Sequence, residues 1–156
     1  MNEDTTTLVE RLQRVQSKLV APKGQTNKFG NYKYRSAEDI LEALKPLLTQ
    51  ENLALIINDE IVEIGGRVYV KASAAVVDFV GAQLSVSAYA REAEDKKGMD
   101  VSQISGSASS YARKYALNGL FCIDDTKDAD ATNTHGKTKP TPAQTRSSAP
   151  SLDELI

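Results

Sequence analysis

The chain of 156 residues is 40% hydrophobic and 26% charged, which is typical of a globular protein long enough to bury a core. Its net charge of -2 and its single cysteine exclude a uniformly basic surface and an internal disulfide. The sequence has neither an apolar run long enough for a membrane span nor a secretory signal at its start. These features favour a protein of a reducing cytoplasm.

Two helices are predicted in the first 50 residues. Apolar residues spaced for one helical face, Leu8, Leu12, Val15 and Leu19, predict a helix from Thr5 to about Val20. Ser36 is expected to cap a second helix, which turns Ile40, Leu41, Leu44, Leu47 and Leu48 inward and is kinked or closed near Pro46. Between them, residues 23–35 are predicted to form a loop that concentrates cations and aromatic rings without an acidic side chain.

From Leu53 to Arg91, alternating apolar and polar residues predict a three-stranded antiparallel sheet with one apolar and one polar face. Gly65-Gly66 and Gly81 mark its turns. A turn centred on Gly81 would place Lys71 directly opposite Arg91 on the polar face, and like charges in that position are destabilising. Either these side chains extend into water, or the face receives a polyanion.

A third helix is predicted from Ser102 to about Phe121. Ile104, Ala108, Tyr111 and Tyr115 share one stripe, so we expect the two tyrosines to face the core. A second stripe is small and polar and ends in a cation; it consists of Gln103, Gly106, Ser110 and Arg113, with Lys114 beside it. Because a glycine inside a helix costs roughly 1 kcal/mol, Gly106 predicts a close approach by another backbone or by a phosphodiester chain.

The composition changes after residue 123. We predict a folded domain over residues 1–123 and a flexible tail over residues 124–156, rich in Pro, Ser, Thr and acidic residues. The chain ends in a short acidic and apolar tip, which is a candidate docking peptide: Leu152, Asp153, Glu154, Leu155 and Ile156.

Motifs for catalysis are incomplete in this sequence. His135-Gly136-Lys137-Thr138 imitates the end of a phosphate-binding loop, but position 131, where the pattern needs a glycine, is Ala. The run of Asp124, Asp125, Asp128 and Asp130 lacks the glycine and the final glutamate of a calcium loop. We therefore predict no enzyme activity, no cofactor and no metal, and a metal-dependent nuclease that uses the Asp run stays a weaker alternative.

Cations that hold phosphates, combined with aromatic rings that stack on bases at about 1–3 kcal/mol each, favour a partner of single-stranded nucleic acid. The candidate DNA-binding residues are Lys28, Tyr32, Lys33, Tyr34, Arg35, Arg67, Lys71, Arg91, Arg113 and Lys114.

Two segments resemble the essential recombination function (ERF) family of phage single-strand annealing proteins. They are KFGNYKYRSAEDILEALKPLL and QISGSASSYARKYALNGLFCIDDTKDADA, and the resemblance covers roughly residues 5–131. Family members often have Thr and Arg where this chain has Ser110 and Lys114, changes that preserve size or charge.

The resemblance implies an α+β fold with a β-β-β-α core and ATP-independent annealing of complementary single strands during phage recombination, in the cytoplasm of the bacterial host. It also implies homo-oligomeric rings or filaments that hold single-stranded DNA and the annealed duplex, and a tail that recruits the host single-strand-binding protein. A passive single-strand-binding or scaffold protein is the main alternative.

Overall fold

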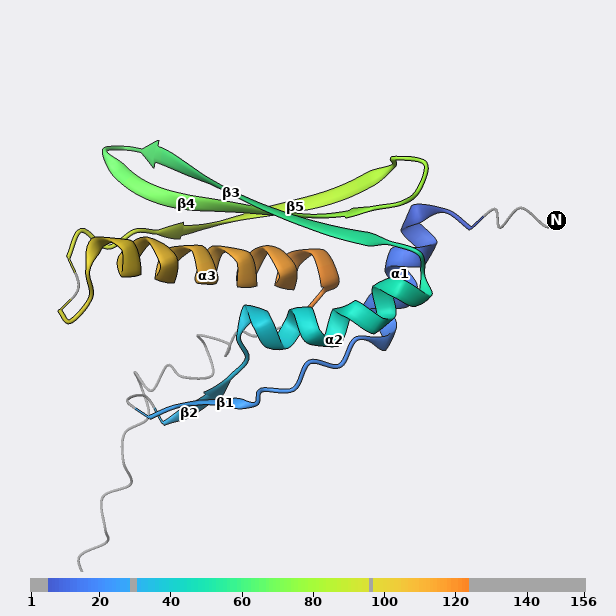
Figure 1. Cartoon of the computed structure of the whole chain (residues 1–156), viewed down its shortest axis with the longest axis horizontal. Helices are drawn as coiled ribbons and strands as arrows, with labels where there is room; N and C mark the ends of the chain where they lie inside the picture. The colour runs from blue at the N-terminus through green and yellow to red at the C-terminus, as the bar shows by residue number, and fades with distance from the viewer. Residues whose placement is uncertain (1–5, 29–30, 96, 124–156) are drawn as a thin grey trace, which may run out of the picture. The chain divides into compact units, whose positions relative to one another are not determined.

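The computed structural model describes residues 6–28, 31–95 and 97–123, which contain three helices and two antiparallel sheets (Figure 1). In chain order the elements are α1 (Leu8–Lys18), β1 (Gln25–Asn27), β2 (Tyr32–Tyr34), α2 (Ala37–Gln50), β3 (Ala54–Ile64), β4 (Arg67–Val77), β5 (Gln83–Arg91) and α3 (Val101–Phe121). This arrangement confirms the α+β class and the β-β-β-α core. Within these ranges, no helix has both the length and the apolar character that crossing a bilayer requires. The predicted tail and its terminal tip lie outside the described residues. The predicted boundary at residue 123 coincides with the end of the described residues.

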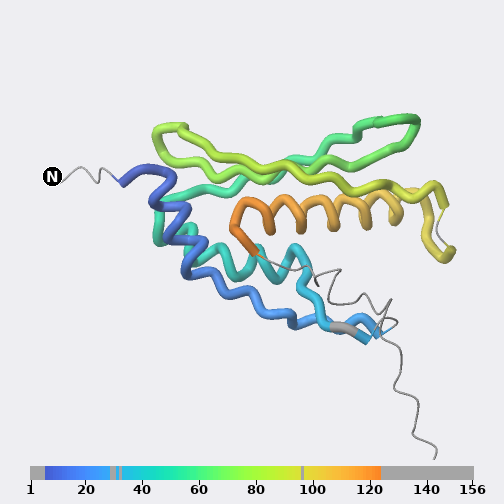
Figure 2. The backbone as a smooth tube through the Cα atoms, turned by 180° about the vertical axis from the view of Figure 1, so that it is seen from behind, coloured from blue at the N-terminus to red at the C-terminus, as the bar shows by residue number. Residues whose placement is uncertain are grey.

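The main sheet has the strand order β3-β4-β5, and α3 lies along one of its faces (Figures 1 and 2). The face of β4 beneath the helix consists of Val70, Ala72, Ala74 and Val76, none of which is more than 2% exposed. The opposing side of α3 is equally small, with Ala108, Ala112 and Ala116 in the same core. Small side chains on both surfaces allow the helix to lie close to the strands.

The register between β4 and β5 differs from the predicted one by two residues. Arg91 pairs with Tyr69, and Lys71 pairs with Tyr89, so the expected opposition of Lys71 and Arg91 is wrong. The cause lies in the turn, where the carboxylate of Asp78 accepts hydrogen bonds from the backbone N–H groups of Val80 (3.1 Å) and Ala82 (2.9 Å). This side chain centres the turn on Val80 instead of Gly81, and each cation consequently faces an aromatic ring.

Both N-terminal helices begin with reciprocal capping contacts. Thr7 and Glu10 cap α1, and Ser36 and Asp39 cap α2, each pair exchanging hydrogen bonds between side chain and backbone. The hydrogen bonds from Ser36 lower the pKa of the Asp39 carboxyl. Helix α2 continues through Pro46 to Gln50.

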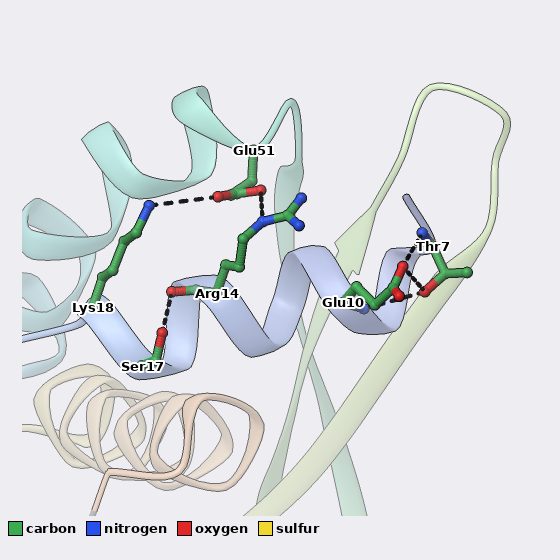
Figure 3. Close-up of polar contacts among 6 residues, drawn as sticks. All are labelled: Thr7, Glu10, Arg14, Ser17, Lys18 and Glu51. Atoms are coloured by element: carbon green, nitrogen blue, oxygen red, sulfur yellow. Dashed lines mark hydrogen bonds and ion pairs between the residues drawn. The ribbon is translucent and has the colours of Figure 1, made fainter. Parts of the chain in front are cut away.

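Helix α1 is fastened to both other helices. The guanidinium of Arg14 donates to the Glu51 carboxylate at 2.8 Å, and the Lys18 amine lies 3.8 Å from the same group (Figure 3). The amide of Gln16 donates to the backbone carbonyl of Leu120 at the end of α3. Since Ile40, Leu44 and Leu48 of α2 are buried, the predicted inward side of that helix is confirmed.

Three other expectations require correction. Residues 23–35 were predicted to be a loop, but β1 and β2 pair as a short antiparallel hairpin. Tyr111 and Tyr115 are 51% and 45% exposed, because the alanine row of α3 faces the sheet and leaves no space for rings there. No described atom lies within 4 Å of a methyl group built on Gly106, so the expected close approach of another backbone is absent from the described residues.

The close contact of α3 with the sheet occurs at Gly119 instead. A methyl group built on Gly119 would lie 2.9 Å from Cγ1 of Val86, a stiff β-branched side chain on β5. Gly119 therefore marks a point where the helix backbone lies close to the strand.

Two identical substitutions in α3 should have opposite effects on stability. We expect Gly106→Ala to raise the free energy of unfolding by about 0.5–1 kcal/mol, because the site is open and alanine favours the helix. Gly119→Ala should lower it by about 1 kcal/mol, since overpacking against Val86 outweighs the gain in propensity. Urea titration of both variants measures the difference, and changes of the same sign would contradict the close packing of α3 on β5.

Candidate nucleic-acid interface

The face of the main sheet that points away from α3 carries a regular mixture of aromatic and basic side chains. One row across the strands contains Glu60, Lys71 and Tyr89, and the next contains Val62, Tyr69 and Arg91. Tyr89 is 50% exposed, and no helix or strand of the described residues covers this face (Figure 1). We call these side chains, together with Arg67, the outer sheet face.

Carboxylates partly neutralise the cations of this face. The amine of Lys71 is hydrogen-bonded to the Glu60 carboxylate across the strands, and this contact raises the pKa of Lys71. Arg91 lies 3.6 Å from Glu94, but both side chains are well exposed, and such pairs contribute little energy. Glu60 thus orders Lys71, whereas Arg91 remains accessible to an anion.

Arg67 at the start of β4 and Arg91 at the end of β5 lie at the same end of the sheet. Both line a shallow depression of about 200 Å³ beside the β3–β4 turn, together with Gly66, Val68, Glu92, Ala93, Glu94, Val101 and Ile104. Val101 and Ile104 belong to α3, so the depression lies where this end of the sheet approaches the start of that helix, and the carboxylate residues Glu92 and Glu94 line it beside the two arginines.

The β1–β2 hairpin carries the second group of predicted residues. Lys28 and Lys33 are exposed, Tyr34 is 36% exposed, and Arg35 is half-buried. The backbone of Tyr32 pairs with Asn27, while its side chain lies outside the described residues. Of these cations, Lys33 lies on β2, while Lys28 directly follows β1 and Arg35 directly follows β2.

These two groups occupy different sides of the domain. In Figures 1 and 2 the β1–β2 hairpin and the main sheet lie on opposite sides of α3. The hairpin cations and the outer sheet face consequently do not form one continuous groove within a single chain.

Arg113 contacts an acidic residue of the sheet. Its Nε lies 2.8 Å and 3.1 Å from the two carboxylate oxygens of Asp59, and its Nη2 lies 2.8 Å from one of them. The hydroxyl of Ser109 donates to the same carboxylate at 2.5 Å. Partial burial raises the pKa of Asp59, but the hydrogen bonds from Arg113 and Ser109 outweigh it and leave the pKa below its ordinary value. The cluster ties α3 to β3.

Lys114 points to a different side of α3 from Arg113. Its Nζ lies 5.8 Å from the ring centre of Tyr115, within the range of a cation–π contact. The two cations that end the predicted polar stripe therefore have different surroundings.

Sequence reasoning missed Asp59 and Glu60 as partners of the predicted cations. Asp59 stands in the inward row of β3 between Ile57 and Ile61, and a carboxylate in an apolar row requires a cationic or hydrogen-bonding partner. That signal was available in the sequence. Glu60 could be assigned to Lys71 only after the β3–β4 register was known.

In the part of the chain that the structure describes, no three His, Cys, Asp or Glu side chains are placed so that they could hold a metal ion together. Asp124, Asp125, Asp128 and Asp130 lie outside that part.

Comparison with known proteins identifies the family. The family model described as the ERF superfamily matches residues 8–154. The chain belongs to the ERF superfamily. It is 56% identical over 141 residues to the Essential recombination function protein of Salmonella phage P22, an alignment that covers 90% of this chain and 67% of that relative. The resemblance noted in the sequence is confirmed, and the matched residues include every element of the fold.

Removing the Asp59 carboxylate should weaken the attachment of α3 and change the response to acid. Because the folded-state pKa is lowered, the stabilisation by Asp59 is present above its unfolded pKa of about 3.9 and is lost as the pH falls through the folded value. We expect Asp59→Asn to lower the free energy of unfolding by about 1–2 kcal/mol at pH 7 and by less at pH 3.

Urea titrations at the two pH values measure this difference. Glu42→Gln is the matched control, since it removes an exposed ion pair with Lys45 and should change stability little. An Asp59→Asn variant as stable as the parent at pH 7 would contradict a structural role for the cluster.

Proposed function

We propose that this protein binds single-stranded DNA and pairs complementary strands, without nucleotide hydrolysis, during phage recombination. The observation that carries the proposal is its 56% identity to a phage protein named for an essential recombination function. The outer sheet face supports it independently, since it combines accessible cations with aromatic rings on a surface that no described element covers.

The proposed contacts are of two kinds: ionic contacts to phosphates and stacking on bases. Arg67 and Arg91 would hold phosphates at the depression, while Tyr69 and Tyr89 would stack on bases. Stacking uses the plane of a base and pairing uses its edge, so a stacked strand keeps its pairing edges accessible. A complementary strand could then test for a match without an energy source.

The other predicted residues take different parts in this proposal. Lys28, Lys33 and Arg35, with Tyr32 and Tyr34, would contact a separate length of DNA at the hairpin. Lys71 would line the outer sheet face from the central strand, where its partner Glu60 orders it. Arg113 would act mainly through Asp59 by positioning α3, and Lys114 remains a candidate for a phosphate contact.

Assembly and partners extend the proposal. The β3 and β5 strands pair on one side only within the described sheet, so copies of the chain could cover each other's edges in a ring or filament. Leu152–Ile156 would recruit the host single-strand-binding protein, and the site of action would be the host cytoplasm.

Neutralising the two guanidinium groups of the depression should weaken binding in a salt-dependent way. We expect Arg67→Gln with Arg91→Gln to reduce the slope of log affinity against log salt by about 1.4, because each phosphate contact to a single strand contributes about 0.7. Fluorescence anisotropy of a labelled oligonucleotide over a range of salt concentrations measures the slope.

Lys45→Gln is the matched control, because it removes a cation from an exposed pair on α2. An unchanged slope in the double arginine variant would contradict phosphate binding at the depression. In a second assay, complementary labelled strands should pair faster with the protein than without it. Slower pairing would indicate a passive coat, and cleavage in magnesium would indicate a nuclease.

A further inference from the structure

Helix α3 presents an aromatic pair that the outer sheet face does not include. The rings of Tyr111 and Tyr115 lie 6.3 Å apart between centres with planes inclined by 25°, and about half of each side chain is exposed. Residues four apart lie on the same helical face, so the two rings form one aromatic surface along a helical turn. Single exposed apolar residues are ordinary, but an adjacent stacked pair requires an explanation.

The electrostatic surroundings of the pair favour an anionic partner. The 21 residues of α3 include no Asp or Glu. Lys114 lies between the two tyrosines in sequence, and its amine lies 5.8 Å from the Tyr115 ring. Ser107 and Ser110 fall on the same side by their helical spacing and can donate hydrogen bonds.

We propose that Tyr111 and Tyr115 form a second base-stacking site, in which the rings receive unpaired bases and Lys114 holds the adjacent phosphate. This inference rests on the proposed binding of single-stranded DNA. Flat rings beside a cation, on a helix whose own residues include no carboxylate, match the chemistry of a polynucleotide. An interface between protein copies would instead be depleted of charge at its centre.

The site is distinct from the outer sheet face, because α3 packs against the opposite side of the sheet. It also differs from the Arg113 cluster, since Arg113 contacts Asp59 on β3. Its contribution to binding is therefore separable by substitution.

The test compares two oligonucleotides of equal length, one of thymidines and one of abasic sugars with the same phosphates. We expect Tyr111→Leu with Tyr115→Leu to lose about tenfold in affinity for the thymidine strand and to bind the abasic strand as the parent does. Tyr111→Phe with Tyr115→Phe should retain binding, because phenylalanine keeps the ring.

Phe79→Leu provides a matched control, as Phe79 is an aromatic residue 86% exposed in the turn after β4. Circular dichroism and sedimentation of each variant report folding and oligomeric mass. Three results would overturn the inference: unchanged affinity in the leucine variant, an equal loss on both oligonucleotides, or a change of mass with unchanged preference for bases. Failure of the parent protein to bind either strand would instead remove the proposed function and this site with it.

Discussion

The contact between α3 and the main sheet determines which surfaces of this protein are available to a partner. Alanines on the helix meet alanines and valines on β4, and Gly119 lies against Val86 of β5. Such a contact tolerates only small side chains, and it buries one face of β4 from Val70 to Val76. The opposite face is left for polar, basic and aromatic residues.

This geometry also explains the separation of the basic residues. Arg67, Lys71 and Arg91 lie on the outer sheet face, whereas Arg113 is turned to the side of α3 that meets β3. The alanine row of α3 excludes Tyr111 and Tyr115 from the core and places them at its edge. A neutral protein can thus offer several local surfaces to a polyanion without a high overall charge.

The patterns that depend on local spacing were predictable from the sequence. The alternation of β3 to β5, the cap at Ser36 and the inward residues of α2 all follow from the spacing of a few side chains. The β4–β5 register could not be fixed, because it depends on how the Asp78 carboxylate closes the turn. The tyrosines of α3 were misplaced because large and small apolar residues share one stripe, and only the space beneath the helix selects alanine.

Among the site residues, the accessible cations of the sheet were predictable but their partners were not. Arg113 looked like a phosphate ligand at the end of a polar stripe, yet its contact with Asp59 joins residues 54 positions apart. Pairings of that kind follow from the packing of α3 across β3, which a single sequence does not specify. The hairpin residues were correctly recognised as a basic and aromatic segment, but their distance from the sheet required the fold.

Photo-crosslinking of an oligonucleotide that carries a photoreactive thymidine analogue, followed by mass spectrometry of the attached peptides, tests the central claim most directly. The account predicts crosslinks on β4 and β5, at or beside Tyr69 and Tyr89. Crosslinks confined to α1 and α2, with none on these strands, would show that the outer sheet face is not where the DNA lies.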